Sequence, residues 1–125
     1  MSERVVALST VGRAEDAERI ARALVERRLA ACVNVVPKVV SVYRWKGEVC
    51  RDQELLLVVK TRRERLGALR EALVEMHPYE VPELVALPIE AGHEPYLAWL
   101  DGEVTPPTAP DPGRPPGRPR PRTRR

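Results

Sequence analysis

Two long β-rich runs joined by a short turn constrain the fold of this 125-residue chain more than any other feature. Residues 32–45 and 48–61 are rich in valine and leucine, and Lys46-Gly47 between them predicts a hairpin turn. Proline cannot donate a hydrogen bond to a sheet ladder, so Pro37 predicts a kink or bulge near an edge. The sequence therefore predicts a long antiparallel hairpin.

The same hairpin decides the expected state of the two cysteines, Cys32 and Cys50. Strand partners across a turn at Lys46-Gly47 have residue numbers that add up to about 93. The cysteines miss that register by roughly eleven residues, so their α-carbons lie well beyond the ~7 Å that a disulfide spans. We therefore expect no intrachain disulfide.

Three other segments show helical patterns. Apolar residues at helical spacing predict an amphipathic helix over residues 13–28, with Gly12 as its N-cap. A second helix is predicted over residues 66–76. It ends at His77-Pro78, because proline disfavours helical geometry in the residue before it. Residues 96–100 predict a short final helix that packs aromatic side chains.

Two shorter apolar runs supply the remaining strands. Residues 5–8 predict a buried strand that is broken from Thr10 onward, and residues 83–88 predict a last core strand. The resulting order is strand, helix, strand, strand, helix, strand and a short helix. A split βαβ pattern of this kind predicts an α+β, ferredoxin-like sandwich, in which both long helices cover one face of an antiparallel sheet.

Composition divides the chain near residue 105. Residues 1–104 hold nearly all of the aliphatic content and are enough for one domain with one core. Residues 105–125 hold eight of the thirteen prolines, and six arginines stand against the single acid Asp111. A segment of this composition cannot bury a core, so we expect a disordered, extended basic tail. Its residues 114–125 either contact nucleic acid weakly and without sequence preference or simply aid solubility.

No apolar run approaches the roughly 18 residues of a membrane span, and no signal peptide is recognisable at the N-terminus. We therefore expect a cytoplasmic protein that contacts no membrane. In that compartment thiols stay reduced.

The predicted hairpin is longer than the domain that carries it. Each arm reaches about 45 Å at ~3.3 Å per residue, whereas a domain of this size is about 34 Å across. The tip, with Tyr43, Arg44 and Trp45, is expected to overhang the domain. Exposed strands with an aromatic tip need a partner, and another copy of the chain is the simplest one. The alternative is a hairpin that curls back on its own sheet.

The most unusual local stretch is residues 77–83, where two prolines frame an imidazole, a phenol and carboxylates. His77 and Glu80 are candidates for binding a divalent cation or orienting a ligand, because neutral imidazole is a common ligand of copper and zinc. The alternative is structural, with the helix end favouring His77 and the prolines shaping the turn. Cys32 is either a thiolate ligand or a small buried hydrophobe. Lys60 either lines a cleft or pairs with a carboxylate.

Signatures of catalysis are missing from the sequence. It holds no glycine-rich phosphate loop and no GxSxG motif, and only two histidines occur. Neither CxxC nor HxxxH is present, so the sequence predicts no closed structural zinc site. The sequence therefore predicts a binding protein and no enzyme.

Five blocks of the sequence resemble the CutA divalent-cation tolerance proteins, in family order, over about residues 4–101. The blocks are AACVNVVP at 30–37, VYRWKG at 42–47, LVVKT at 57–61, HPYEVPE at 77–83 and YLAWL at 96–100. The resemblance implies a ferredoxin-like subunit in a tight homotrimer, similar in architecture to the PII signalling proteins. It also implies tolerance of copper and other divalent ions, with no enzymatic activity.

The ligands implied by copper-binding relatives are retained only in part. The resemblance implies a cysteine at the end of the first strand and two consecutive histidines closing the second long helix. This sequence has Ser9, Met76 and His77 there. Met76 suits Cu(I) through its thioether and equally fits a helix core. The positions that resemble a cleft lining are Cys32, Trp45, Lys60, Tyr79 and Glu80.

Three hypotheses follow. The first is a homotrimer that binds copper or another divalent cation weakly, through His77 with Met76 and Cys32, and contributes to metal tolerance. The second is a PII-like signalling module that binds a small ligand at intersubunit clefts near Trp45 and Tyr79. The third is a nucleic-acid-associated protein that acts through its basic tail.

Overall fold

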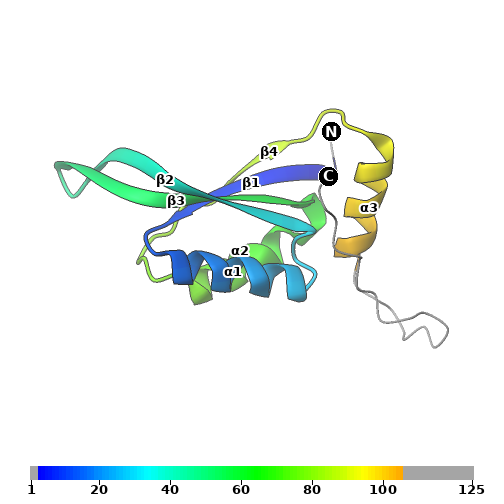
Figure 1. Ribbon diagram of the computed structural model, residues 1–125, viewed down its shortest axis with the longest axis horizontal. Helices are drawn as coiled ribbons and strands as arrows, with labels where there is room; N and C mark the ends of the chain where they lie inside the picture. The colour runs from blue at the N-terminus through cyan, green and yellow to red at the C-terminus, as the bar shows by residue number, and fades with distance from the viewer. Residues whose placement is uncertain (1–2, 106–125) are drawn as a thin grey trace.

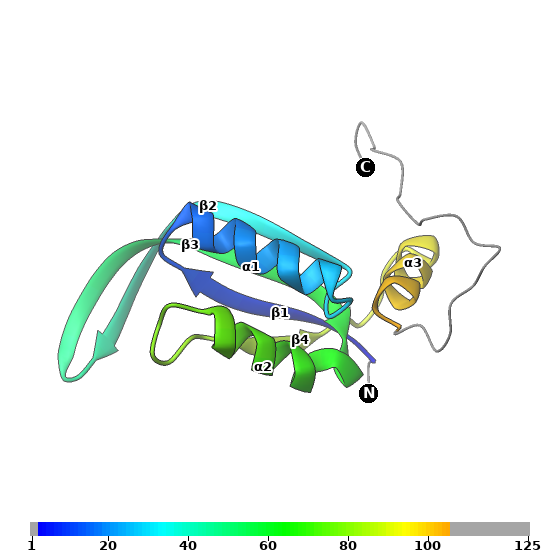
Figure 2. The same cartoon turned by 90° about the horizontal axis from the view of Figure 1, so that it is seen from below.

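The computed structural model describes residues 3–105, which form a four-stranded antiparallel sheet and three α-helices (Figure 1). The elements are β1 (Arg4–Val11), α1 (Ala14–Glu26), β2 (Cys32–Trp45), β3 (Glu48–Arg62), a 3₁₀ turn (Arg63–Arg65), α2 (Leu66–Met76), β4 (Val85–Pro88) and α3 (Glu94–Val104). The strand order is β2-β3-β1-β4, and α1 and α2 cover the same face of the sheet (Figure 2). The predicted α+β, ferredoxin-like sandwich is confirmed. The tail expected over residues 105–125 lies, apart from Thr105, outside the described residues.

The core fills the space between the sheet and the two long helices. Ile20 and Leu24 of α1, Leu57 of β3, and Leu69 and Leu73 of α2 are fully or almost fully buried in one apolar cluster. Their helical spacing gives α1 and α2 the apolar stripe that the sequence predicted. No helix within residues 3–105 combines the length and the apolar character that a membrane crossing requires.

The β2–β3 hairpin has the turn and the bulge predicted from the sequence. Lys46 and Gly47 form the turn, with φ angles of 51° and 83°. The register stays constant from the tip to the Val39–Glu54 pair. A bulge at Pro37-Lys38 then shifts the register by one residue, and Lys38 takes a φ of 63°. Proline has no ladder hydrogen bond to lose at a bulge, which is why it is tolerated there.

The register also keeps the two cysteines apart. Cys32 pairs with Lys60, whereas Cys50 pairs with Tyr43 near the tip. Ten residues of β3 separate Lys60 from Cys50, which is about 33 Å along the strand. Both thiols are free and half-buried, in agreement with the expectation that they form no disulfide.

The hairpin extends past the rest of the sheet (Figures 1 and 2). β1 ends at Val11, which pairs with Leu55, so residues 39–45 and 48–54 are paired only with each other. The alternative, a hairpin that curls back on its own sheet, is not what the structure shows. An isolated two-stranded hairpin is at best marginally stable in water. The outer half of this ribbon therefore lacks the support that β1 gives to the inner half.

Two expectations at the first strand and helix are corrected by the structure. β1 is not broken at Thr10 but continues to Val11, because its backbone stays paired with β3 up to that point. The N-cap of α1 is Arg13 and not Gly12, and no side chain caps the helix. Gly12 instead lies in the connection, where its missing side chain has a different use described below.

The last strand is not a core strand, contrary to the expectation. β4 spans only Val85–Pro88 and lies at the edge of the sheet, where Val85 and Leu87 are 50% and 54% exposed. The sequence pattern shows that these side chains are apolar, but it does not indicate which surface covers them. The final helix is also longer than residues 96–100, because α3 runs from Glu94 to Val104.

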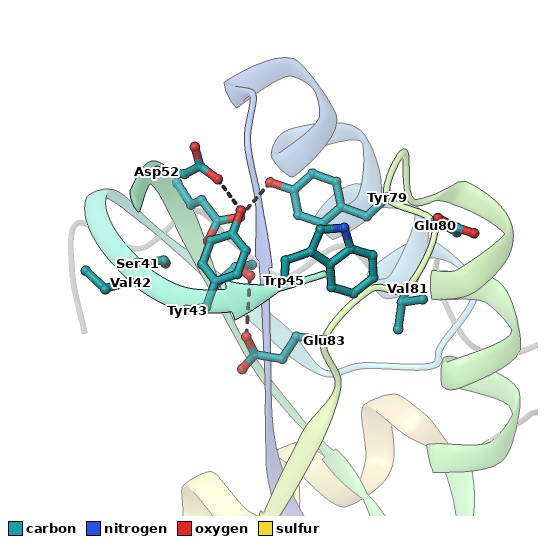
Figure 3. A pocket seen from close by; sticks show the side chains of 11 residues that line it. Ser41, Val42, Tyr43, Trp45, Asp52, Tyr79, Glu80, Val81 and Glu83 are labelled. Atoms are coloured by element: carbon teal, nitrogen blue, oxygen red, sulfur yellow. Dashed lines mark hydrogen bonds between the residues drawn. The ribbon is translucent and has the colours of Figure 1, made fainter. Parts of the chain in front are cut away.

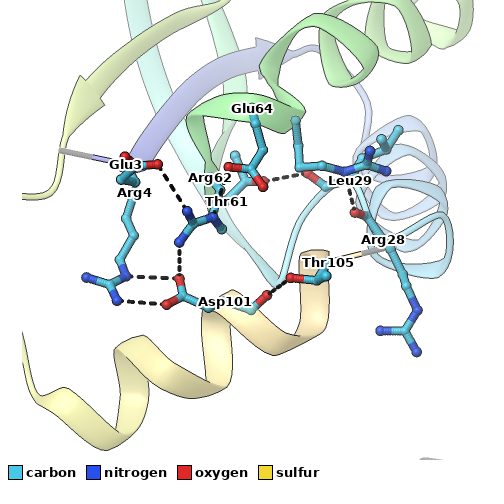
Figure 4. A network of polar contacts seen from close by, with 10 residues as sticks. Glu3, Arg4, Arg28, Leu29, Thr61, Arg62, Glu64, Asp101 and Thr105 are labelled. Carbon is cyan, nitrogen blue, oxygen red and sulfur yellow. Dashed lines mark hydrogen bonds and ion pairs between the residues drawn. The ribbon is translucent and has the colours of Figure 1, made fainter. Parts of the chain in front are cut away.

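An ion-pair network attaches α3 to the end of the sheet opposite the hairpin (Figure 4). Asp101 accepts two hydrogen bonds from Arg4, at 3.0 and 2.7 Å, and one from Arg62 at 2.8 Å. Arg62 also pairs with Glu3 and Glu64. The hydrogen bond from Arg4, followed by that from Arg62, lowers the pKa of Asp101 to about 2.

We expect Asp101→Asn to lower the free energy of unfolding at pH 7 by about 1 kcal/mol, because the side chain is 30% exposed and solvent screens part of the interaction. A lowered carboxyl pKa stabilises the fold above the unfolded-state value, and this contribution is lost as the pH falls toward 2. The difference between the two proteins should therefore vanish between about pH 4 and pH 2. Urea unfolding followed by circular dichroism measures the free energy of unfolding of both proteins. The control is Glu18→Gln, which removes the exposed ion pair with Arg22 and should change stability by less than about 0.5 kcal/mol.

Candidate functional site

A pocket of about 650 Å³ lies where the overhanging hairpin meets the turn that follows α2 (Figure 3). Its aromatic side chains are Tyr43 and Trp45 from β2 and Tyr79 from the turn. The three side chains are 41%, 43% and 38% exposed. A volume of this size is within the range of small-ligand sites.

Cross-strand register explains why the hairpin side of the pocket combines aromatic and acidic groups. Tyr43 pairs with Cys50, and side chains two residues apart in a strand share a face. Trp45 and Tyr43 therefore lie on the same face as Asp52 and Glu54. The Tyr43 hydroxyl donates a hydrogen bond to the Asp52 carboxylate, which raises the pKa of Tyr43 to about 12.

A second phenol–carboxylate pair joins the turn to the hairpin. The Tyr79 hydroxyl donates to Glu54 Oε2 at 2.5 Å, and Glu54 is only 6% exposed. Burial, followed by this hydrogen bond, raises the pKa of Tyr79 well above its usual range. A Cβ atom at Gly12 would lie 3.1 Å from the Tyr79 hydroxyl oxygen. Glycine at position 12 therefore leaves the phenol room to reach the carboxylate.

Four carboxylates line the pocket: Asp52, Glu54, Glu80 and Glu83. No lysine or arginine among the described residues lines it, and none of the four carboxylates forms an ion pair within residues 3–105. Glu83 accepts a long hydrogen bond of 3.4 Å from Thr10, and Glu80 has no hydrogen-bond partner in the same part of the chain. A partly enclosed group of unpaired negative charges raises the local concentration of cations.

His77 lies behind the pocket and is 7% exposed. Its Nδ1 accepts a hydrogen bond from the Tyr79 backbone N–H at 3.0 Å. The neutral ring then carries its proton on Nε2, which donates to the Thr10 carbonyl at 2.8 Å. The imidazole thus ties the turn after α2 to the end of β1. A metal ion can bind either ring nitrogen only by replacing one of these two backbone hydrogen bonds.

The other residues singled out in the sequence lie in three places. Met76 is half-buried next to His77 and packs against the main core. Ser9 is buried and donates to the Glu83 carbonyl at 2.7 Å. Cys32 and Lys60 pair across β2 and β3, and the Lys60 ammonium donates to the Asn34 side chain.

The structure therefore brings Trp45, Tyr79 and Glu80 together and leaves Cys32 and Lys60 away from them. Lys60 is six residues from Glu54 along β3, which is about 20 Å. In the part of the chain that the structure describes, no group of three or more histidine, cysteine, aspartate or glutamate side chains is arranged to hold a metal ion. Residues 3–105 of a single chain thus present an acidic, aromatic pocket and no closed metal centre among themselves.

Sequence reasoning missed the two carboxylates of the hairpin, Asp52 and Glu54. A signal for them was present, because the register predicted from the turn pairs residue 41 with Asp52 and residue 39 with Glu54. Both carboxylates then fall on the face that carries Tyr43. Glu83 was missed as a pocket residue because it was assigned to a core strand.

We expect Asp52→Asn to lower the pKa of Tyr43 from about 12 toward the ordinary value near 10, because the substitution removes a charged hydrogen-bond acceptor that opposes formation of the phenolate. Phenolate absorbance at 295 nm measures this as a function of pH. The difference between each protein and its Tyr43→Phe counterpart isolates the signal of Tyr43. An unchanged titration of Tyr43 in Asp52→Asn would contradict the assigned hydrogen bond.

The fold and the pocket define a class of α+β proteins: a ferredoxin-like domain with an overhanging hairpin and an acidic, aromatic cleft at its base. Within that class, the family described as the CutA1 divalent ion tolerance protein matches residues 5–103. The chain belongs to this family.

Individual relatives agree with this assignment. The chain is 58% identical over 95 residues to the divalent-cation tolerance protein CutA of Thermus thermophilus, a match that covers 76% of this chain and 92% of that protein. It is 50% identical over 84 residues to human protein CutA, covering 67% of this chain and 47% of the human protein. The chain thus spans about half the length of the human relative.

Solved structures show the same fold. The Thermus thermophilus divalent cation tolerance protein aligns with a TM-score of 0.80 at 54% identity, covering 82% of this chain and 99% of the solved chain. CutA from Xylella fastidiosa aligns with a TM-score of 0.81 at 38% identity, covering 83% and 100%. Other relatives are named chloroplastic, in Arabidopsis thaliana, and periplasmic, in Archaeoglobus fulgidus. The cytoplasmic location expected from the sequence therefore stays a prediction.

Proposed function

We propose that the protein is a cytoplasmic homotrimer that binds copper or another divalent cation reversibly, contributes to metal tolerance and catalyses no reaction. Membership of the divalent ion tolerance family supports the general role. The observation that carries cation binding is the pocket itself, whose four carboxylates have no cationic partner within residues 3–105. Cations accumulate at such a site because its negative charge is not balanced locally.

Exposed apolar strands support assembly. On the hairpin, Val40, Val42 and Val49 are 50–66% exposed, and on the β4 edge Val85 and Leu87 are 50% and 54% exposed. Both outer strands of the sheet, β2 and β4, are unpaired on their far sides in the part of the chain described. A long ribbon and an apolar edge of this kind are covered in stable proteins by another strand or layer. Sister copies supply that cover in our proposal.

We propose His77 as the residue that contacts the metal most directly, with Met76 beside it as a ligand for Cu(I). Binding is weak, because the ion must displace a backbone hydrogen bond from the imidazole. Glu80 and the other pocket carboxylates attract the ion. Cys32 and Lys60 join this site only where a neighbouring subunit brings the end of its own hairpin arm to the pocket.

Light scattering and calorimetry test the proposal together. Three copies of a 14.1 kDa chain give a particle of about 42 kDa. Titration of Cu(II), and of Cu(I) under reducing conditions, should show saturable binding that His77→Ala and Glu80→Gln each weaken about tenfold.

The control for both variants is His93→Ala, which removes the other histidine, an exposed residue at the start of α3. Glu80→Gln separates loss of metal affinity from loss of structure, because Glu80 makes no hydrogen bond or ion pair within residues 3–105. Equal affinities for the wild type, His77→Ala and Glu80→Gln would show that the metal binds elsewhere. Absence of any saturable heat would show that the protein is not a metal binder.

A further inference from the structure

The pocket and the C-terminal segment of this chain carry unbalanced charges of opposite sign. The pocket carries four carboxylates and no cationic side chain from residues 3–105. Residues 105–125 carry six arginines and one aspartate. Within residues 3–105, the ion pairs join arginine to acid along α1 and between α3 and neighbouring segments, and none of them involves a pocket carboxylate.

We propose that the proline–arginine segment at residues 114–125 docks into the pocket between the hairpin and the turn after α2. Its guanidinium groups pair with the carboxylates of Glu80 and Glu83 and stack on the exposed rings of Trp45 and Tyr43. The proposal concerns this chain's own tail, and it does not depend on metal binding.

The proline–arginine segment and the pocket are complementary in shape as well as in charge. Prolines alternate with arginines over residues 118–122, and proline fixes φ near −65°, which favours an extended polyproline conformation. Extended segments of this type bind in grooves lined by aromatic side chains, where they lose little conformational entropy. Arginine adds flat guanidinium groups that pair with two carboxylate oxygens at once and stack on aromatic faces. The pocket offers both kinds of surface side by side (Figure 3).

The tail is long enough to reach the pocket of its own chain. It leaves the domain at Thr105, next to Asp101, whose partner Arg62 ends β3. Ten residues of β3 separate Arg62 from Asp52, which is about 33 Å. At ~3.1 Å per residue, the thirteen residues from 105 to 118 span about 40 Å. Arginines from position 118 onward can therefore enter the pocket without any unfolding of α3.

The test uses a domain that ends at Thr105 and a synthetic peptide of residues 110–125. The shortened chain should fold, because 99% of the solved Thermus thermophilus chain aligns with just 82% of this one. A Trp99→Phe background leaves Trp45 as the only tryptophan, so its emission reports events in the pocket. We expect the peptide to change this emission saturably and 1 M NaCl to abolish the change, since screening weakens exposed charge pairs. A peptide with glutamine in place of all six arginines should not bind.

A matched pair of double variants locates the site. Glu80→Gln with Glu83→Gln should weaken peptide binding about tenfold, the effect of losing charged hydrogen-bond acceptors. Glu71→Gln with Glu75→Gln removes the same net charge from exposed positions on α2 and should leave binding unchanged. Equal weakening by both pairs would show a diffuse electrostatic attraction and would overturn the proposal. A peptide that binds single-stranded RNA but not the domain would overturn it as well, and would identify the tail as a nucleic-acid arm.

The full-length chain provides an independent readout. In the Trp99→Phe background, the emission of Trp45 should differ between residues 1–125 and residues 1–105, and high salt should remove the difference. Identical emission in the two proteins at low salt would mean that the tail does not occupy the pocket in the intact chain.

Discussion

Replacement of His77 by alanine is expected to lower the free energy of unfolding by about 3 kcal/mol. The substitution leaves the Tyr79 N–H and the Thr10 carbonyl without partners in a region where the side chain is only 7% exposed. Each unsatisfied buried backbone group costs roughly 1–3 kcal/mol. Urea unfolding followed by circular dichroism measures the loss at a fixed protein concentration, because assembly makes apparent stability depend on concentration.

Two further variants test whether the loss of stability comes from the two hydrogen bonds of His77. His77→Asn replaces the imidazole acceptor Nδ1 with an amide oxygen that can accept the Tyr79 N–H, but its side chain cannot reach Thr10, so it should recover about half of the loss. His93→Ala removes an exposed imidazole that makes no capping hydrogen bond to α3 and should change stability by less than about 0.5 kcal/mol. If His77→Ala unfolds like His93→Ala, the imidazole is not a structural tie and remains free to act as a ligand.

The two backbone hydrogen bonds of His77 also show what a sequence pattern cannot predict. Residues 77–83 combine an imidazole, a phenol and carboxylates in a short stretch, and from the sequence both a metal-binding and a structural role of His77 are open. What favours the structural role is the Thr10 carbonyl, which lies 67 positions away in the sequence. No local pattern indicates that the end of β1 meets the end of α2 with a carbonyl directed at the ring.

Local rules succeeded where the physics is local. The turn at Lys46-Gly47 and the pairing of opposite residues fixed the register of the outer hairpin, because side chains in a strand alternate strictly. The position of the bulge followed from Pro37, which has no N–H for the ladder. The end of α2 at Met76 followed from His77-Pro78. In each case the decisive groups are within a few residues of one another.

The predicted burial was wrong for side chains whose cover depends on a neighbouring surface that the sequence pattern does not identify. The apolar run that includes Val85 and Leu87 was assigned to the core, yet these side chains are about half exposed at the sheet edge. Alternating valines on the hairpin present the same problem. An apolar pattern indicates that a side chain is more stable out of water. It does not indicate whether residues of the same chain or of another copy cover that side chain. The grouping of Cys32 and Lys60 with the pocket residues likewise rested on resemblance, and within one chain they lie apart.

The second large effect concerns the hairpin valines. Val40→Asp with Val49→Asp is expected to convert the proposed trimer of about 42 kDa into chains of 14.1 kDa at micromolar concentration, as measured by light scattering. The two valines are 50% and 66% exposed in the single chain, and the register places both on the face of the ribbon opposite Tyr43 and Asp52. Burying two unpaired carboxylates in an apolar contact costs several kcal/mol each, far more than a surface change in the monomer.

The helices provide a control matched in residue type. Val25 and Val74 are 41% and 50% exposed on α1 and α2, so Val25→Asp with Val74→Asp adds the same charge outside the ribbon and should leave the assembly intact. Because Val40 and Val49 do not line the pocket, the separated chains should keep the Tyr43–Asp52 hydrogen bond and the raised pKa of Tyr43. If the hairpin variant stays at 42 kDa, the ribbon does not form the contact. If both double variants dissociate, the added charge and not the position breaks the assembly, and the role assigned to the overhang is wrong.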